Sequence, residues 1–402
     1  MNILYHHRTM GRGAEGVHIA NMVNAFECCG HSVSIISPPG VDPRNDAGKD
    51  VFELKKKDKD THFSFGFFLK VFSRKFPQFL FELLEIIYNF YAFFAVGKKL
   101  RNAKFDLIYE RYAFFGFITG CLAKRRKIPF VLEVNETSGL ERFRGQAFIS
   151  LTNWFEKKIL SQADLIVVVS SFLKSKIVER GVAAQKILVL PNGVDLEKFN
   201  IESETSSARS IREKYDIRDN DIVFGFVGWF ADWDRLDKLI EIFHEVHTSH
   251  TGSKLMLVGD GAIRQKLEKQ VTDLRLQKNV IFTGPVERNK VQHYIAAIDI
   301  CVLPHSNKFG SPIVLFEFMA MAKTVIAPML DPITDVLTNG RTGLLFQVGD
   351  FVGLKKILIT VLTDESLRKK LGYAAKEEIV ENHTWHRKAE QVMRALRLSY
   401  QD

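Results

Sequence analysis

The chain has 402 residues, more than a single hydrophobic core normally serves, so two domains are expected. Its apolar fraction of 46% and charged fraction of 26% are those of an ordinary globular protein and exclude extensive disorder. The net charge of +9 favours anionic partners, among which nucleic acid, acidic lipid and phosphorylated substrates all qualify. The four cysteines form no C-x-x-C pair and the first residues predict no signal peptide, so a reducing cytoplasm is expected.

Short apolar runs alternate with helical patterns along the whole chain. The first set of predicted buried strands covers residues 3–5, 32–36, 107–109, 130–133 and 165–169. A second set covers residues 223–227, 255–258, 280–282, 300–303 and 324–327. This alternation predicts parallel sheets covered by helices on both faces, and therefore an α/β protein with two Rossmann-like domains in tandem.

The first strand leads into a glycine loop in which Gly11, Gly13 and Gly16 have the spacing G-x-G-x-x-G. On its own this spacing is typical of a dinucleotide site. Such a site needs an acidic residue at the end of the second strand, where this chain instead continues into Ser37 and Pro38. NAD is therefore not expected.

Residues 63–117 hold much of the aromatic content of the chain, mixed with lysines and arginines. No run there reaches the ~18 uninterrupted apolar residues of a membrane span, because Glu82 and Glu85 interrupt the longest candidate, so no crossing is expected. The composition is also typical of helices that lie among lipid headgroups, and we expect residues 63–104 to rest on an anionic membrane. A core helix with a basic outer face is the alternative.

Polar residues follow the strand at residues 130–133. Asn135 and Glu136 should emerge at the carboxyl edge of the first sheet, where open α/β sheets bind ligands. Both are candidate catalytic residues near the acceptor, and loop residues that cap the next helix are the alternative. Further along, an apolar strand ends in turn residues at 191–195 and a polar stretch covers 201–210, where we place the hinge between the domains.

Residues 309–328 hold a helix start, one acidic residue and a buried strand in a fixed order. Gly310 and Ser311 form a loop, with Ser311 as the expected N-cap and Pro312 at the first helical position. Such a helix start offers backbone N–H groups and partial positive charge to a phosphate. Glu317 lies about one and a half turns further along, where its carboxylate can accept hydrogen bonds from both hydroxyls of a ribose. The alternative is an amphipathic helix whose one acid faces solvent.

Together with Pro191-Asn192-Gly193-Val194-Asp195 and Val258-Gly259-Asp260-Gly261, this segment resembles the family 4 retaining glycosyltransferases. The resemblance covers nearly the whole chain and implies the GT-B architecture, in which two Rossmann-like domains present parallel sheets across a cleft. It implies an acceptor-binding domain at residues 1–195 and a nucleotide-sugar-binding domain at residues 196–380. A C-terminal helix within residues 381–402 is then expected to cross back to the first domain.

The resemblance also implies where substrates bind. The glycine loop would meet the donor phosphates or the acceptor, with Arg8 among the side chains there, and the loop after residue 282 would pack against the nucleotide base. The implied substrate-binding residues are Gly11, Arg12, Gly13, Gly16, His18, Gly228, Gly284, Val286, Gly310, Ser311, Pro312 and Glu317.

The chain departs from the family pattern where the donor diphosphate would bind. Most members carry an arginine directly after the glycine at position 228 and a lysine five positions later, whereas this chain has Trp229 and Asp234. Phe309 stands where the family has the first acid of its E-x7-E signature. We therefore expect Arg235 and Lys308 to supply the missing positive charge to catalysis, with a surface ion pair of Arg235 to a nearby aspartate as the alternative.

These features predict a cytoplasmic hexosyltransferase, resting on the inner face of the membrane. It would move a sugar from a nucleotide sugar to a glycan or lipid-linked acceptor in cell-surface polysaccharide or glycoconjugate synthesis. No metal or other cofactor is expected, because cations and a helix dipole can stabilise the leaving diphosphate. The alternatives are a GT-B sugar-nucleotide epimerase and a non-catalytic nucleotide-sugar-binding protein. Nucleic acid is not an expected partner, because no basic patch with exposed aromatic residues is indicated after residue 117.

Overall fold

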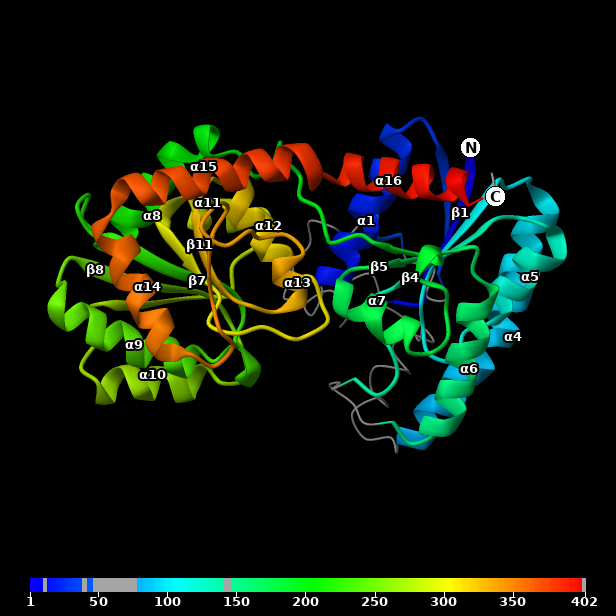
Figure 1. Ribbon diagram of the computed structural model, residues 1–402, viewed down its shortest axis with the longest axis horizontal. Coiled ribbons are helices and arrows are strands. Elements are labelled where there is room, and N and C mark those ends of the chain that lie inside the picture. The colour runs from blue at the N-terminus through cyan, green and yellow to red at the C-terminus, as the bar shows by residue number, and fades with distance from the viewer. Residues whose placement is uncertain (10–12, 38–41, 46–77, 141–145, 400–402) are drawn as a thin grey trace, which may run out of the picture. The chain divides into compact units, whose positions relative to one another are not determined.

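The computed structural model describes residues 1–9, 13–37, 42–45, 78–140 and 146–399 (Figure 1). The chain divides into two compact units, one formed by Met1–Leu190 with Trp385–Asp402 and the other by Pro191–Thr384. Each unit contains one six-stranded sheet in which every pair of neighbouring strands is parallel. This confirms the two predicted Rossmann-like domains.

The first unit has the strand order β2-β1-β3-β4-β5-β6. Its strands are β1 (Asn2–His6), β2 (Ser32–Ile36), β3 (Leu107–Arg111), β4 (Phe130–Val134), β5 (Leu165–Val168) and β6 (Ile187–Val189). Its α-helices are α1 (Gly13–Cys28), α4 (Gln78–Asn102), α5 (Ile118–Arg126), α6 (Ile149–Gln162), α7 (Ser171–Val178) and α16 (Trp385–Leu398), and the short η1 (Pro43–Asn45) and η2 (Ala184–Lys186) complete it.

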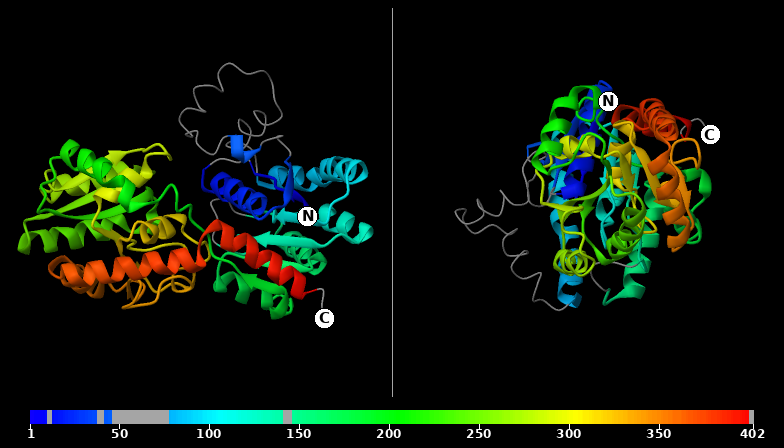
Figure 2. Two further views of the ribbon diagram at one scale, coloured as in Figure 1. Left: turned by 90° about the horizontal axis from the view of Figure 1, so that it is seen from above. Right: turned by 90° about the vertical axis from the view of Figure 1, so that its left-hand side faces the viewer.

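Helices cover both faces of this sheet. On one face α1 and α16 pack together, with α1 against β2 and α16 against β5 (Figure 1, Figure 2). Phe26 and Trp385 share a core there with strand residues such as Tyr5 and Tyr109. On the other face lie α4, α5 and α6, which contact one another in that order. The C-terminal helix is thus an integral part of the first unit.

The second unit has the strand order β12-β11-β10-β7-β8-β9. Its strands are β7 (Ile222–Trp229), β8 (Ser253–Asp260), β9 (Val280–Gly284), β10 (Ile300–Val302), β11 (Thr324–Pro328) and β12 (Leu344–Phe346). Its α-helices are α8 (Thr205–Lys214), α9 (Leu236–Ser249), α10 (Arg264–Asp273), α11 (Val291–Ala297), α12 (Ile313–Ala320), α13 (Asp331–Thr334), α14 (Phe351–Thr363) and α15 (Glu365–Asn382), with the short η3 (Ile201–Glu204) and η4 (Asp232–Asp234).

The chain passes from one unit to the other at 190/191 and at 384/385, whereas the sequence predicted domain boundaries at 195/196 and 380/381. The difference has a local cause: Val194 pairs with Thr384, and its N–H donates to the carbonyl of His383 at 3.0 Å, so both segments are held in the second unit.

The expected hinge covered the turn residues 191–195 and the polar stretch 201–210. The units divide at 190/191, directly before the turn, but the part of the hinge at residues 201–210 is wrong. These residues form η3 and most of α8, and α8 packs against α11 within the second unit. Arg212 fixes the end of α8 by donating to the carbonyl oxygens of Asp221 at 2.5 Å and Ala297 at 3.1 Å. A polar sequence here reflects the exposed face of a helix rather than a linker.

Candidate functional site

The loops after β7 and β8 lie so close together that they require glycine. A Cβ atom on Gly259 would stand 2.0 Å from the carbonyl oxygen of Gly228, and one on Gly261 would stand 2.2 Å from that of Phe230. The next loop turns at Gly284, whose φ of +74° is a conformation that glycine adopts at little cost. These glycines leave backbone without side chains at the carboxyl edge of the second sheet, where α/β proteins bind ligands. Val286, after this turn, is partly buried against the core.

The helix start predicted at Ser311 needs correction. The N-cap of α12 is Pro312, and Ser311 does not cap the helix because its hydroxyl accepts the backbone N–H of Asn192 at 3.1 Å. The amide nitrogen of Asn192 also donates to the Ser311 carbonyl at 2.7 Å, and both residues are buried. These bonds join two of the motifs that carried the family resemblance. Pro312 has no N–H group, so the expected phosphate donors from Ser311 to Ile313 reduce to two.

The loop before α12 is braced by its own Asn307. The side-chain oxygen of Asn307 accepts the backbone N–H groups of Phe309 and Gly310. A Cβ atom on Gly310 would stand 2.9 Å from that oxygen, so a larger residue would disturb the brace. Lys308 is exposed on this loop.

Glu317, on α12, is buried, with 1% of its side chain exposed, so the alternative of a solvent-facing acid is wrong. One carboxylate oxygen accepts a hydrogen bond from Arg288. The other oxygen has no hydrogen-bond partner among the residues that the structure describes. A buried acceptor of this kind normally has a partner. The geometry leaves it available to a hydroxyl donor such as a ribose.

Two cations that the sequence reasoning missed surround this carboxylate. The guanidinium of Arg288 lies 5.7 Å from the ring centroid of Phe199. Burial and the charge of Arg288 lower the pKa of Lys198, while Glu317 acts in the opposite direction. Both cations stand close to motifs that the sequence had singled out: Arg288 is four residues after Gly284, and Lys198 is three residues after the P-N-G-V-D turn.

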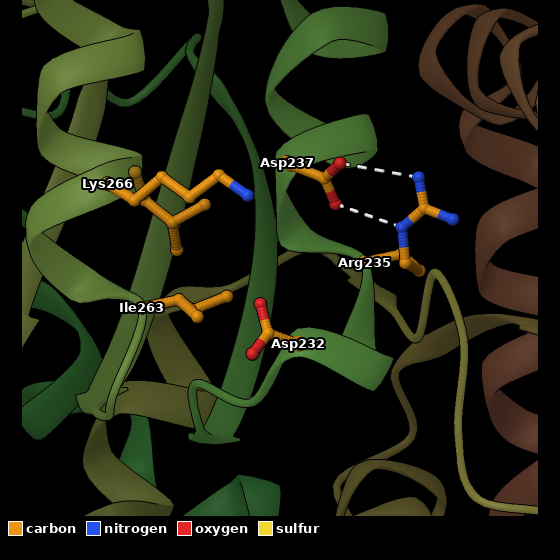
Figure 3. Close-up of a pocket in the computed structure, with 6 residues that line it drawn as sticks. Asp232, Arg235, Asp237, Ile263 and Lys266 are labelled. Carbon is orange, nitrogen blue, oxygen red and sulfur yellow. Dashed lines mark hydrogen bonds and ion pairs between the residues drawn. The ribbon is translucent and has the colours of Figure 1, made fainter.

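Arg235 is held in an ion pair, which is the alternative that the sequence left open. Its Nε and Nη2 atoms donate to the two oxygens of Asp237 at 3.1 and 3.3 Å, and its guanidinium lies 5.4 Å from the ring centroid of Phe351. A pocket of about 250 Å³ lies beside this pair, with Asp232 and Lys266 also projecting into it (Figure 3). The pocket is polar and lies against the start of α9, apart from Glu317 on α12.

Arg235 and Lys308 nevertheless both lie close enough to His305 for their charges to act on it. Burial lowers the pKa of His305, and the positive charges of Arg235 and Lys308 lower it further. At the position of the family lysine, burial raises the pKa of Asp234 to about 7, although its carboxylate accepts the Ala231 N–H at 3.2 Å. Burial thus favours the neutral form of this carboxyl, so that it repels an anion less than an ordinary aspartate would.

In the first unit a buried carboxylate, Glu133, gathers two of the predicted residues. Its oxygens accept from Tyr109 at 2.7 Å, Arg111 at 2.6 Å and Asn135 at 2.8 Å, and one lies 2.9 Å from Nε2 of His18. Burial acts to raise the pKa of Glu133, but His18 and Arg111 outweigh it and hold that pKa well below the ordinary value. Sequence reasoning did not select Glu133, although a charged residue inside a buried strand was the available signal.

The remaining predicted residues of the first unit are less closely connected. Gly13 begins α1 with a φ of +63° and Gly16 is buried in that helix, while Gly11 and Arg12 lie outside the described residues. Glu136 is half-buried after β4. Arg8 donates to Glu85 at 2.7 Å and lies over the ring of Tyr88, so it is attached to α4.

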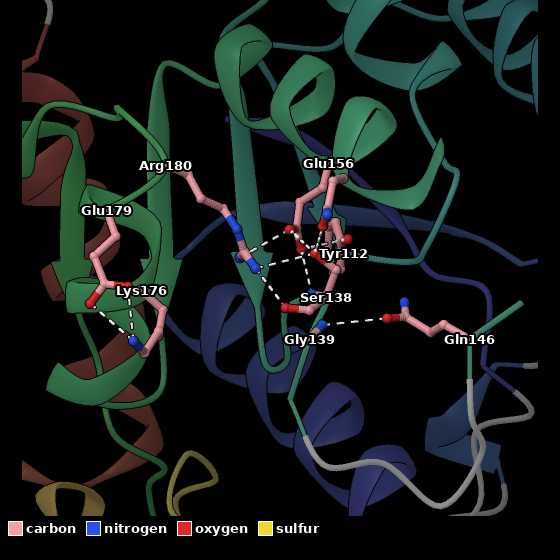
Figure 4. A network of polar contacts seen from close by, with 9 residues as sticks. Tyr112, Ser138, Gly139, Gln146, Glu156, Lys176, Glu179 and Arg180 are labelled. Carbon is pink, nitrogen blue, oxygen red and sulfur yellow. Dashed lines mark hydrogen bonds and ion pairs between the residues drawn. The ribbon is translucent and has the colours of Figure 1, made fainter. Parts of the chain in front are cut away.

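A second buried carboxylate fixes the loop that follows β4. Glu156 accepts from the hydroxyl of Tyr112 at 2.9 Å and from that of Ser138 at 2.6 Å, and it pairs with Arg180 at 2.9 Å (Figure 4). Arg180 also donates to the Ser138 carbonyl at 2.6 Å. This network ties the loop after β4 to α6 and to Arg180 just after α7, so Asn135 and Glu136 lie in a braced segment. Within the described part of the chain, no group of three or more metal-ligating side chains is placed to hold an ion.

The two parallel sheets, the glycine turns and the buried acid on α12 define a GT-B glycosyltransferase. The family model "Glycosyltransferase Family 4" matches residues 15–198, and "Glycosyl transferases group 1" matches residues 207–378. Between them they account for most of both units. The chain therefore belongs to the family 4, group 1 glycosyltransferases and is a hexosyltransferase-type enzyme.

Relatives whose names state an activity are distant in sequence, but the two described here match most of the chain. The chain is 24% identical to the N-acetyl-alpha-D-glucosaminyl L-malate synthase of Bacillus anthracis, over 82% of this chain and 86% of that protein. It is also 24% identical to the UDP-Gal:alpha-D-GlcNAc-diphosphoundecaprenol alpha-1,3-galactosyltransferase of Escherichia coli, over 71% of this chain and 73% of that protein.

Solved structures share the fold at lower sequence identity. A glycosyltransferase from Rickettsia africae has a TM-score of 0.74 at 17% identity, with 100% of this chain and 99% of that chain covered. The Anabaena protein HepE in complex with UDP has a TM-score of 0.69 at 16% identity, with 98% and 99% covered. These likenesses support the GT-B fold.

Proposed function

We propose that this enzyme transfers a sugar from a nucleotide-sugar donor to a glycan or lipid-linked acceptor, with retention of configuration and without a metal. The bond between the anomeric carbon and the diphosphate breaks, a glycosidic bond forms to an acceptor hydroxyl that loses its proton, and the nucleoside diphosphate leaves. The place of this reaction is the inner, cytoplasmic face of the membrane, and its product enters cell-surface polysaccharide or glycoconjugate synthesis.

The observation that carries the proposal is the carboxylate of Glu317. One oxygen accepts a hydrogen bond from Arg288, which orients the carboxylate. The other has no partner among the described residues, so it can accept a hydrogen bond from a ligand. We assign this oxygen to the hydroxyls of the donor ribose. The structures of HepE with UDP and with UDP-glucose support a nucleotide-sugar donor for this fold.

The donor diphosphate needs compensating charge near the start of α12. The glycine turn at Gly228 and the loop at Gly310 let backbone approach the phosphates, and Arg235 and Lys308 are the cations proposed to neutralise them. In this role Arg235 would leave Asp237 and pair with the diphosphate instead. The Arg235–Asp237 pair is partly solvent-exposed, and such a pair contributes only about 0 to 1 kcal/mol. Asn135 and Glu136 are the residues proposed to act at the acceptor.

The nature of the acceptor is argued from the relatives. The Escherichia coli galactosyltransferase acts, by its name, on a sugar attached to diphosphoundecaprenol. A Staphylococcus aureus relative, 28% identical over 56% of this chain, is named for capsular polysaccharide biosynthesis. Both names support a glycan or a lipid-linked glycan as acceptor.

A thermal-shift panel of UDP-, GDP- and ADP-sugars tests the donor assignment. We expect one nucleotide sugar to raise the melting temperature of the wild type and of the control Glu287→Ala, whose exposed acid pairs with Lys290 at 2.8 Å. Glu317→Ala should bind that donor about 10- to 150-fold more weakly, the equivalent of one lost charge-assisted hydrogen bond. A donor affinity of Glu317→Ala within twofold of the wild type would refute the assignment.

A further inference from the structure

Helix α4 in the first unit has mostly polar and small residues on its buried side and large apolar residues on its exposed side. Its buried positions are mostly polar or small, and they are Glu82, Asn89, Ala92, Val96, Gly97 and Leu100. Its outward positions are large and apolar, and they are Phe79, Leu83, Leu84, Ile87, Phe90, Tyr91, Phe93 and Phe94. A surface helix of a globular protein normally shows the opposite arrangement. Exposure of this much apolar side chain on one helix therefore indicates a binding surface.

Five of the outward residues form a single stripe. Phe79, Leu83, Ile87, Phe90 and Phe94 recur every three or four positions, which places them on one side of an α-helix. Phe90 and Phe94 are 70% and 65% exposed. We call these five residues the α4 apolar face.

Basic residues continue the α4 apolar face beyond its C-terminal end. Lys98 and Arg101 are exposed and follow Phe94 at the same three- to four-residue spacing. At the other end α6 adds Phe148 and Ile149, which are exposed and lie beside the first turns of α4, because the Phe148 N–H donates to Glu82 at 2.9 Å. The surface is thus apolar along its length and cationic at one end.

Within the described residues, α4 is also the one helix long and apolar enough to cross a membrane, by length and composition alone. Its inner side, however, is fastened to the unit by polar bonds. Glu82 accepts the backbone N–H groups of Ala147 and Phe148 at 2.7 and 2.9 Å, and Asn89 donates to the carbonyl of Phe115 at 2.9 Å.

Further bonds of the same kind hold the middle of α4. Tyr88 hydrogen-bonds to His6 at 2.8 Å, and Glu85 pairs with Arg8 at 2.7 Å. A spanning helix would have to break these bonds and carry both acids into hydrocarbon, where ionisable side chains are costly. α4 can present its apolar face to lipid only while its polar side stays on the protein.

We propose that the α4 apolar face docks on an anionic lipid bilayer, with α4 lying in the plane of the interface and the cations at its end contacting lipid phosphates. The charge distribution favours an anionic bilayer as the partner. Both acids of α4, Glu82 and Glu85, are bonded to other parts of the unit on the inner side, so the outward side of the helix carries phenylalanines and cations but no acid. Docking rests on the proposed function in one respect, since an enzyme bound to the membrane surface can reach a lipid-linked acceptor. Binding to a bilayer can nevertheless be measured without any sugar transfer. The predicted membrane segment also includes residues 63–77, which lie outside the described residues.

Cosedimentation of the full chain with vesicles tests the inference. We expect the wild type to partition at least tenfold more onto phosphatidylcholine vesicles containing phosphatidylglycerol than onto phosphatidylcholine alone, and less at high salt. Phe90→Ser with Phe94→Ser should lose at least tenfold of this binding. Lys98→Gln with Arg101→Gln should lose roughly fivefold for each cation.

The matched control is Val352→Ser with Tyr373→Ser, which removes apolar side chains that are 67% and 63% exposed on the second unit and should bind vesicles within twofold of the wild type. Absence of vesicle binding, or binding unchanged in the Phe90 and Phe94 variant, would overturn the inference. Membrane association that resists alkaline carbonate would show a spanning helix instead. Self-association abolished by the same two serines would show that a second copy covers the face. Donor binding by thermal shift, measured in each variant, separates these failures from failure of the proposed function.

Discussion

Replacing Glu133 by glutamine removes the negative charge at the centre of the first unit and changes little in volume. Arg111, which is itself buried, donates to this carboxylate at 2.6 Å and would lose its counterion. Removing one partner of a buried ion pair costs about 3 to 5 kcal/mol, because an uncompensated charge stays behind. With about 2 to 4 °C lost per kcal/mol in a domain of this size, the transition of the first unit should fall by about 6 to 20 °C.

Calorimetry, with chemical denaturation at 25 °C as a second measure, provides the assay. The matched control is Glu179→Gln, whose carboxylate is exposed and pairs with Lys176 at 2.8 Å (Figure 4). That exposed pair should contribute no more than about 1 kcal/mol. A Glu133→Gln variant as stable as the control would refute the reasoning.

The pH dependence gives the prediction a second readout. The folded pKa of Glu133 lies below its unfolded value, so the stabilisation is complete above the unfolded pKa of about 4.3 and is lost as the pH falls below it. The stability difference between wild type and Glu133→Gln should therefore shrink in acid. A difference that grew below pH 4 would contradict the assigned direction of the shift.

Two further predictions concern the second unit. The folded pKa of Asp234, about 7, lies above its unfolded value, so stability should fall as the pH rises from about 4 to 7. Asp234→Asn should thus be more stable than wild type at pH 8, by on the order of 2 kcal/mol after allowance for partial exposure, and equal to it near pH 3.5, as measured by denaturation at both pH values. Arg235→Ala with Lys308→Ala should abolish transfer while the protein stays folded, and should raise the pKa of His305, followed by NMR titration. Wild-type turnover in this double variant would exclude the two cations from catalysis.

Sequence patterns predicted the fold where the chain is buried on both faces. Each of the ten apolar runs in the two predicted sets coincides with a strand of the two sheets to within one or two residues, because strands of a parallel sheet read as continuous apolar segments. Strand β12 escaped prediction because it has three residues, Leu344–Phe346, at the edge of its sheet. α8 was taken for part of a linker because it carries no buried residue among the ten in the helix, so composition alone could not distinguish it from a loop.

The site was harder to predict because its decisive contacts join distant segments. Glu317 was chosen from its helix, but its partner Arg288 lies 29 positions earlier and carries no local signal of that pairing. Ser311 was misassigned as an N-cap because local rules cannot see Asn192, which takes its hydroxyl. The polar buried side of α4 was equally hidden, since only the bonds of Glu82 show that this acid faces inward.

Transfer of a labelled sugar tests the central claim most directly. The donor identified by thermal shift, labelled in its sugar, is incubated with the enzyme and with glycan and lipid-linked acceptors, and both product and remaining donor are analysed. We predict label in an acceptor glycoside with wild type and Glu287→Ala, and a kcat/KM about 10- to 150-fold lower with Glu317→Ala. Label returned as an isomeric nucleotide sugar would show an epimerase, and donor binding without transfer to any acceptor would show a binding protein; either result would contradict the proposed function.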